Sequence, residues 1–510
     1  MKAAAVTDRY QMASPESRVI EPNSLIALLA LGQVAMWTLA PAISHISPPL
    51  DVVESYMWGR EWVIATYKHP SMPGWALEAS YLITGAYGWP AYLVSQLFIA
   101  ASFIFVFLLG RDLMGPERAA AGTLLLTGIT YYAWWTTEFK HNIAETPFWA
   151  GLPWLLWRAV ERRSVTWWVL AGTLAGVGMY ARLTVGLLMV TASVWMLVDP
   201  RARRSLATPG PWIGLAVFLV LCIPLARWLI ANDFLPLAYA SSRSGHAQNA
   251  GRFILQTVVN LSGMVVMLVV AGLLTRPRRG QLAATALISI RVPAERRAFT
   301  LLFIFTFVPV ALAIAGALIT GGGLKTGWGN SLFGLVGLLA ILLTSHRFTR
   351  RSLNTIAAAA AICLLIVPIC YALVIGIGPR FNGMVTRVHW PQREISQRME
   401  AIWTRDIGRP LRIVTGDSWV AGLAGLTAKD RPSILDNGDL KLSPWIAPAR
   451  IDAEGMLVVW DARSKGPPEA LRDVLASYAI KEEHFAWPRS KNRGNLVIRY
   501  VEIPPKQPRQ

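Results

Sequence analysis

Apolar segments of about 20 residues recur through most of this 510-residue chain, and they constrain its fold more than any other feature. A helix of about 20 apolar residues matches the hydrocarbon core of a bilayer. Only 15% of the residues are charged, against roughly 25% in soluble proteins. The sequence therefore predicts a polytopic α-helical membrane protein. We expect eleven spans, at residues 24–44, 90–110, 117–136, 143–158, 165–181, 183–198, 211–230, 253–275, 298–319, 331–345 and 353–378.

Basic residues are concentrated in alternate loops between these segments. The net charge is +19, and Lys and Arg are enriched in the cytoplasmic loops of membrane proteins. Nucleic-acid binding is not expected, because the basic residues do not gather on one soluble module. We therefore place the N-terminus and the basic loops in the cytoplasm, and the opposite loops and the C-terminus outside. The basic loops are 111–118, 158–163, 199–204, 275–281 with 294–297, and 345–351.

Residues 379–510 have the composition of a soluble domain. The alternation of strands and helices in this part predicts a small α/β domain. The chain thus divides into a membrane domain, 1–378, and a soluble domain, 379–510. The expected elements are an amphipathic helix (393–406), a strand (411–416), a short helix (419–427), a strand (456–461), a helix (467–478) and a strand (495–504).

The long loop 45–89, which follows the first span, is unusually rich in charged and aromatic residues. We expect two short helices in it, one from Asp51 and one from about Ser71. Asp51 and Glu54 are three residues apart and share a helix face. One interpretation is a capping box, with Asp51 as the N-cap and Glu54 at the third helical position. The other is a carboxylate at the mouth of a membrane cavity, acting as a general base.

Cationic residues follow in the same loop. Lys68 and His69 lie where they could bind a phosphate through charge-assisted hydrogen bonds. The alternative is ordinary decoration of the membrane interface, with long side chains that reach toward water. Arg60 is a weaker candidate for the same site and could simply face solvent.

Three further outer loops carry candidate site residues. The loop 136–142 lies in a short turn between two spans, so its Glu138 and Lys140 must lie near the interface and within reach of the first loop. Asn142 is a candidate binding residue, although it could instead be an N-cap with Glu145 three positions later. Lys325 lies among glycines, which let backbone approach a ligand closely. Arg243 lies in a polar loop that could be a lid or a linker.

Several of these motifs resemble GT-C glycosyltransferases of family 39, which include aminoarabinose transferases and protein O-mannosyltransferases. The motifs are Asp51 with its aromatic-rich helix, YKHPSMPGW, EFKHNIAETPFW and LKTGWG, with RPLRIVTGDSWVAGLAGLTAKDRPSILDNGD in the soluble domain. Adjacent Asp-Glu is common in that family, whereas two valines separate Asp51 from Glu54 here.

The resemblance implies a bacterial inner-membrane enzyme of the proteobacterial branch, with its soluble domain in the periplasm. It would transfer a sugar from a polyprenyl-phosphate donor to lipid A, another glycolipid or a protein, with inversion. Asp51 would activate the acceptor, and Lys68, Lys140 and Lys325 would stabilise the departing phosphate. Glu54 and Glu138 would orient the sugar or these cations.

Two other functions stay open from the residues alone. A transporter or flippase of a lipid-linked sugar is one, although carriers bind their substrates near the membrane midplane and these ionisable residues gather at outer loops. A scaffold that uses the soluble domain to bind partners is the other. No cofactor and no metal site is predicted, although Asp51 and Glu54 would allow a divalent ion. Cys222, Cys363 and Cys370 lie in apolar segments without metal-ligand spacing and are expected to be core residues.

Overall fold

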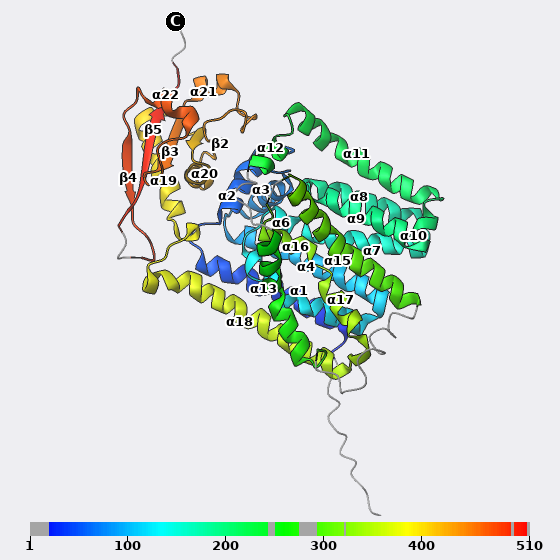
Figure 1. Cartoon of the computed structure of the whole chain (residues 1–510). Coiled ribbons are helices and arrows are strands. Elements are labelled where there is room, and N and C mark those ends of the chain that lie inside the picture. The colour runs from blue at the N-terminus through cyan, green and yellow to red at the C-terminus, as the bar shows by residue number, and fades with distance from the viewer. Residues whose placement is uncertain (1–19, 243–249, 275–292, 321–322, 491–493, 507–510) are drawn as a thin grey trace, which may run out of the picture.

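The computed structural model describes residues 20–242, 250–274, 293–320, 323–490 and 494–506. It contains a helical bundle with a small α/β domain at one end, so the predicted fold class is confirmed (Figure 1). We call this end of the bundle the domain-side end. The helices of the bundle are α1 (Pro22–Ser44), α4 (Trp89–Met114), α5 (Pro116–Leu124), α7 (Thr146–Arg162), α8 (Val165–Ala181), α9 (Val185–Val198), α11 (Pro209–Ala231), α13 (Ala250–Val270), α15 (Pro293–Thr320), α17 (Val336–Leu343) and α18 (Arg350–Asn382).

Short helices connect these long ones. They are α2 (Leu50–Arg60), α3 (Met72–Thr84), α6 (His141–Ala144), α10 (Pro200–Ser205), α12 (Leu235–Ser242) and α16 (Gly329–Leu332).

Six helices within the described residues are long and apolar enough to cross a membrane, or seven if the bent pair Thr326–Leu332 and Val336–Leu343 forms one span. The predicted spans 143–158, 165–181 and 183–198 correspond to α7, α8 and α9, which have only 14 to 17 residues. At 1.5 Å per residue these helices are shorter than the hydrocarbon core. The protein is thus a multi-span membrane protein, and the count of eleven spans stays a prediction.

The predicted span 117–136 is wrong as a single helix. Helix α5 ends at Leu124, and the chain continues in three 3₁₀ turns, Leu125–Gly128, Thr130–Tyr132 and Trp134–Thr137. Backbone groups freed by such a break must find partners inside the protein, since the bilayer core offers none. Here buried polar side chains of α1 and α4 supply them, as the carbonyls of Tyr132 and Thr136 show. Gln33 donates to the first at 3.1 Å, and Ser95 and Gln96 donate to the second at 2.6 and 3.0 Å.

A second break lies beside the first. Helices α16 and α17 meet at an angle of 62°. The Asn330 amide donates to the Tyr131 carbonyl at 2.7 Å, and the Tyr132 hydroxyl donates to the Asn330 carbonyl at 3.1 Å. The two interrupted segments therefore satisfy part of each other's backbone. Interrupted helices of this kind mark binding sites in other membrane proteins.

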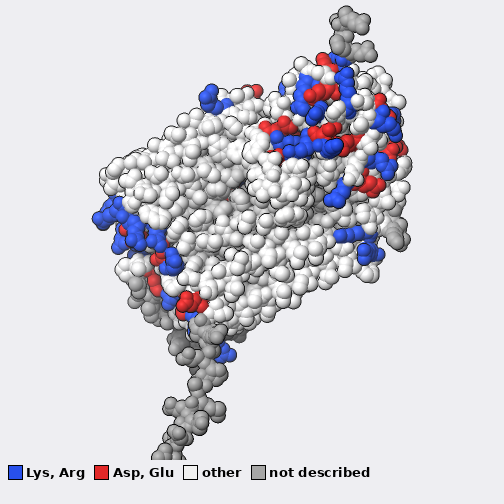
Figure 2. Space-filling view, turned by 180° about the vertical axis from the view of Figure 1, so that it is seen from behind, with Lys and Arg blue, Asp and Glu red and all other residues white. Residues whose placement is uncertain are grey.

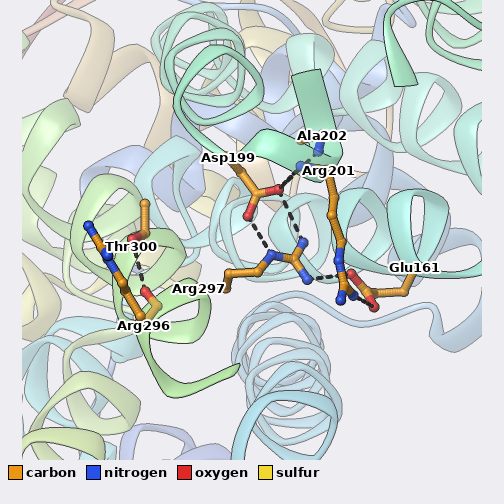
Figure 3. A network of polar contacts seen from close by, with 7 residues as sticks. All are labelled: Glu161, Asp199, Arg201, Ala202, Arg296, Arg297 and Thr300. Carbon is orange, nitrogen blue, oxygen red and sulfur yellow. Dashed lines mark hydrogen bonds and ion pairs between the residues drawn. The ribbon is translucent and has the colours of Figure 1, made fainter. Parts of the chain in front are cut away.

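Ion pairs join the basic loops at the end opposite the soluble domain. Arg297 contacts Asp199 at 2.8 Å and Glu161 at 2.7 Å, and Arg201 contacts Glu161 at 2.9 Å (Figure 3). Lys and Arg gather at that end in the space-filling view (Figure 2). The loops 158–163, 199–204 and 294–297 thus share one end of the bundle, as the alternation of charge predicts. The loop 275–281 lies outside the described residues.

Similar contacts bring in two more of the predicted loops. Arg118 pairs with Glu295 at 3.5 Å, and Arg350 forms an ion pair with Glu117. The loops 111–118 and 345–351 therefore lie at the same end as the others.

The soluble domain contains a five-stranded sheet of order β2-β1-β3-β5-β4, in which β1 is parallel to both β2 and β3, and β5 is antiparallel to both β3 and β4. The predicted strands and the first two predicted helices are confirmed. Strands β2 and β4 were not predicted, and the predicted helix 467–478 is reduced to two short turns. The elements are α19 (Gln392–Ile407), β1 (Ile413–Gly416), α20 (Ser418–Leu426), β2 (Ser433–Asp436), α21 (Pro448–Glu454), β3 (Met456–Asp461), a 3₁₀ turn (Glu469–Leu471), α22 (Arg472–Leu475), β4 (Lys481–Phe485) and β5 (Leu496–Ile503).

Helices α2 and α3 form a hairpin between the bundle and the soluble domain (Figure 1). Their positions agree with the two short helices predicted for the loop 45–89. The hairpin closes tightly where Gly59 meets Gly74. A Cβ at Gly59 would lie 2.1 Å from the Gly74 carbonyl oxygen. Only glycine allows this approach, which holds the two halves of the loop together.

We therefore expect Gly59→Ala to destabilise the protein by about 1–3 kcal/mol or more, because backbone must move to admit the methyl group. The measurement is the thermal unfolding temperature of the detergent-purified protein. The control is Gly186→Ala in α9, where an added Cβ meets nothing within 4 Å. Equal melting temperatures for the two variants would contradict the close approach of Gly59 to Gly74.

Candidate active site

Asp51, Glu138 and Lys140 form one charged cluster at the domain-side end. Lys140 Nζ lies 2.7 Å from Glu138 Oε2 and 3.7 Å from Asp51 Oδ2. The Asp51 backbone N–H donates to Glu138 Oε1 at 3.3 Å. The predicted proximity of the two outer loops is therefore seen in the structure. The Asp51 side chain is 41% exposed, so its carboxylate is the most accessible group of the three.

Lys140 carries a positive charge that its neighbours maintain. Burial disfavours the charged amine, but the carboxylates of Glu138 and Asp51 outweigh it and raise the pKa of Lys140. One cation thus faces two carboxylates, which leaves this cluster able to accept a proton or a further cationic group.

A second ion pair lies on the same hairpin. Glu54 is buried, and its Oε1 accepts from Lys68 Nζ at 2.6 Å. Burial disfavours the lysine charge as well, yet Glu54 raises the pKa of Lys68. The ammonium group is also surrounded by aromatic rings, with the centroids of Trp58, Tyr67 and Tyr239 at 5.6, 5.4 and 5.7 Å. Lys68 is therefore a fixed cation in an aromatic cage.

These contacts overturn both capping-box interpretations. Pro49 occupies the N-cap of α2, so Asp51 lies inside the first turn and makes no capping bond. Glu54 faces Lys68 instead of the helix N-terminus. Lys140 is at the N-cap of α6, and the side chain of Glu145 turns toward Arg182.

The pair Glu145–Arg182 was not predicted. Arg182 donates to Glu145 at 2.8 Å, and both side chains are buried. Thr184 and Ser331 also donate to this carboxylate. Charge-assisted bonds from the α8–α9 turn and from α16 thus converge on the start of α7. An arginine at the end of an apolar segment indicates that a carboxylate partner is near. Nothing in the sequence indicates that this partner is Glu145, 37 residues earlier.

The His69 ring lies against the ring of His141, with centroids 4.1 Å apart. Burial and the neighbouring His141 hold the pKa of His69 well below its usual range. His141 Nε2 donates to the Pro70 carbonyl at 3.0 Å. Both rings are therefore neutral near pH 7, so His69 could offer hydrogen bonds but not a positive charge to a phosphate.

The outer motif LKTGWG, which contains Lys325, lies close to Asn142 and Arg182. A Cβ on Gly327 would lie 2.7 Å from the Asn142 amide nitrogen, and the Arg182 guanidinium lies 5.6 Å from the centroid of the Trp328 ring. Lys325 is exposed, and its charge contributes to the lowered pKa of His69. Asn142 thus lies beside Gly327, and Lys325 lies near enough to act on His69, whereas Arg243 lies outside the described residues.

Arg60 does not belong to this cluster. Its guanidinium donates to the carbonyls of Gly425 and Leu426 at 3.3 Å and of Pro432 at 2.9 Å. The first two lie at the C-terminal end of α20, where carbonyls lack intrahelical partners and the helix dipole favours a cation. Arg60 therefore fastens the hairpin to the soluble domain, which corrects its prediction as a phosphate-binding residue.

The arrangement offers an accessible carboxylate beside several fixed cations, which suits nucleophile activation next to a phosphate leaving group. Comparisons with known proteins show a similar fold. The overall structure is similar to that of ArnT from Cupriavidus metallidurans bound to undecaprenyl phosphate, with a TM-score of 0.62 and 13% identity over 93% of this chain and 97% of the other. The apo form of ArnT gives a TM-score of 0.61 and 12% identity over 94% and 98%. The chain has the fold of ArnT.

Sequence comparisons point the same way over part of the chain. Residues 68–228 match the family model of dolichyl-phosphate-mannose-protein mannosyltransferases. The lipopolysaccharide core galacturonosyltransferase RgtA of Rhizobium johnstonii (strain DSM 114642 / LMG 32736 / 3841) is 26% identical over 224 residues. That match spans 42% of this chain and 42% of RgtA. The ArnT-like fold and the matched family model confirm the predicted resemblance to GT-C glycosyltransferases.

The buried pair Glu145–Arg182 gives a stability prediction. We expect Arg182→Gln to destabilise the ArnT-like bundle by about 3–5 kcal/mol, because the Glu145 carboxylate is left buried without its cation. The double variant Arg182→Gln, Glu145→Gln removes both charges and should restore part of the lost stability. Thermal unfolding in detergent measures this, with Arg227→Gln as the control, since Arg227 is exposed on α11. An unchanged melting temperature for Arg182→Gln would show that the pair contributes no stability.

Proposed function

We propose that this protein is a membrane glycosyltransferase that moves a sugar from a polyprenyl-phosphate donor to an acceptor at the domain-side face. The observation that carries the proposal is the meeting of Asp51 with Lys140, and of Glu54 with Lys68, at the domain-side end of an ArnT-like bundle. A carboxylate can accept the acceptor's proton, and fixed ammonium groups can stabilise a leaving phosphate.

The reaction is a single displacement. An acceptor hydroxyl attacks the anomeric carbon of the donor sugar, and its proton passes to the Asp51 carboxylate. The bond between the anomeric carbon and the phosphate oxygen breaks, and the polyprenyl phosphate departs with the electron pair. Attack from the face opposite the leaving group inverts the anomeric centre.

The cations have distinct neighbours and therefore distinct roles. Lys68 is the primary phosphate ligand, because its cage of three aromatic rings keeps the ammonium in one place. Lys140 and Lys325 add charge from the second and third loops. Glu54 and Glu138 hold the two buried lysines in position until the phosphate arrives. Preorganised charge of this kind needs no rearrangement at the moment of reaction.

The relatives suggest the class of substrate. RgtA is a galacturonosyltransferase of the lipopolysaccharide core, and a structure of ArnT has undecaprenyl phosphate bound. We propose a bacterial inner-membrane location, with the soluble domain in the periplasm and the basic end of the bundle in the cytoplasm. The acceptor would be lipid A, another outer glycolipid or a protein. No metal is assigned to the reaction.

The most direct test compares outer glycolipids from cells with and without the gene by mass spectrometry. A mass difference of one sugar in a glycolipid identifies both the sugar and its acceptor. A flippase would instead move labelled lipid-linked sugar across vesicles without releasing polyprenyl phosphate, and that result would replace the transferase proposal.

Asp51 is the proposed general base, so Asp51→Asn should reduce transfer by about 10²–10⁴-fold. The melting temperature should stay near that of the wild type, because Asp51 caps no helix and its side chain is partly exposed. Transfer is measured with purified protein, lipid-linked sugar and glycolipid extract. Asp233→Asn, another exposed carboxylate, is the control and should keep full activity. Full activity of Asp51→Asn would refute the base assignment.

The neighbours Lys68 and His69 should differ in their effect on binding of undecaprenyl phosphate, the kind of lipid phosphate that departs in the proposed reaction. Lys68→Gln removes the caged cation, and we expect affinity for undecaprenyl phosphate to fall about 10–100-fold, the value of one charge-assisted contact. His69→Gln should change it only a few-fold, since the lowered pKa of His69 keeps that ring neutral. Isothermal titration calorimetry at pH 7 measures both. A larger loss for His69→Gln than for Lys68→Gln would reverse these roles.

A further inference from the structure

The soluble domain reaches the cage of Lys68 through one hydrogen bond. The indole N–H of Trp58 donates to Asp436 Oδ2 at 3.3 Å. Asp436 is the last residue of β2, and Trp58 lies in the last turn of α2. Trp58 is buried, and its ring is one wall of the aromatic cage around Lys68. A residue of the soluble domain thus contacts a side chain that contacts the proposed phosphate ligand.

Asp436 is held in place by its own domain. Its backbone N–H donates to Ser443 Oγ at 2.9 Å, and β2 pairs in parallel register with β1. The residue lies at the carboxyl end of the parallel strands, and α20 leaves the same edge of the sheet after β1. Ligands of open α/β sheets are bound at this edge. Here the edge faces the α2–α3 hairpin, and Trp58 occupies it.

A carboxylate is a costly choice for a buried hydrogen-bond acceptor. Asp436 is fully buried, and among the described residues its Oδ1 has no hydrogen-bond partner. An unpaired buried charge is unfavourable unless a nearby cation compensates it. Burial raises the pKa of Asp436, while Ser418, Trp58 and Lys68 counteract that effect. The charge of Lys68 therefore acts on Asp436.

We propose that Asp436 is a positioning residue for Lys68, acting through the Trp58 indole, so that the soluble domain sets the place of the phosphate ligand. The inference rests on the proposed function, in which Lys68 binds the phosphate of the lipid donor. Without the bond from Asp436 the indole can rotate, and the cage loses the wall that fixes the ammonium group. Asp436 itself does not touch the substrate.

The test measures binding of undecaprenyl phosphate to the full-length protein in detergent by calorimetry. Asp436→Ala and Trp58→Phe should each weaken binding about tenfold, as expected for one hydrogen bond to a charged group. Asp436→Asn should stay within about threefold of wild type, because its amide oxygen still accepts from the indole. The double variant Asp436→Ala, Trp58→Phe should be no weaker than either single variant, since both remove the same bond.

The control is Arg431→Gln, which breaks another contact between the soluble domain and the hairpin. Arg431 donates to both carboxylate oxygens of Glu78, at 2.7 and 2.8 Å, and contacts neither Trp58 nor Lys68. It should lower the melting temperature and leave the affinity unchanged. An equal loss of affinity in this variant would show general loosening of the junction and overturn the proposal.

The remaining outcomes separate the inference from the function. Wild-type affinity in Asp436→Ala, or additive losses in the double variant, would overturn the positioning role while leaving the proposed function intact. If Asp436→Ala does not fold, Trp58→Phe decides, since it keeps an aromatic ring and removes the N–H donor. A wild-type protein that binds no undecaprenyl phosphate would overturn the proposed function itself.

Discussion

The need to satisfy backbone polar groups inside a bilayer determines how this site is built. Two segments that read as membrane spans are interrupted. Freed carbonyls of the first accept from Gln33, Ser95, Gln96 and Asn330, and the Asn330 carbonyl of the second accepts from the Tyr132 hydroxyl. These bonds satisfy backbone groups that a continuous helix would satisfy internally. Glu138 and Lys140 follow directly after the first interruption, so their position beside Asp51 depends on this polar network.

Charge compensation shapes the site in the same way. Three buried cations of the described residues each have a carboxylate partner: Lys68 with Glu54, Lys140 with Glu138, and Arg182 with Glu145. Such charges would be too costly to bury alone. A phosphate that binds Lys68 must therefore compete with Glu54. In the proposed reaction the donor phosphate, a phosphodiester with one negative charge, would replace the Glu54 carboxylate as the partner of Lys68.

The sequence predicted well what depends on composition and local pattern. Apolar segments, the alternation of basic loops and the outer hairpin with Asp51 and Lys68 follow from hydropathy and from proline positions. It predicted poorly what depends on pairing between distant segments. Glu54 and Glu145 fit capping boxes by spacing, yet their carboxylates are taken by Lys68 and Arg182. The segment 117–136 is apolar enough for a span, and the side chains that support its interruption lie on other helices.

Helix α2 connects the soluble domain to the proposed site, because it packs against both the bundle and α20. Every residue from Val52 to Gly59 is buried, so this helix needs cover on all faces and has no side for water. The bundle covers one side, and α20 covers another so closely that a Cβ on Gly422 would lie 2.5 Å from Met57 Sδ. Arg60, the last residue of α2, also donates to the carbonyls of Gly425 and Leu426 at the C-terminal end of α20. Residues Val52 to Gly59 of α2 can therefore be buried only where membrane bundle and soluble domain meet, which makes the two parts a single structural unit around the proposed chemistry.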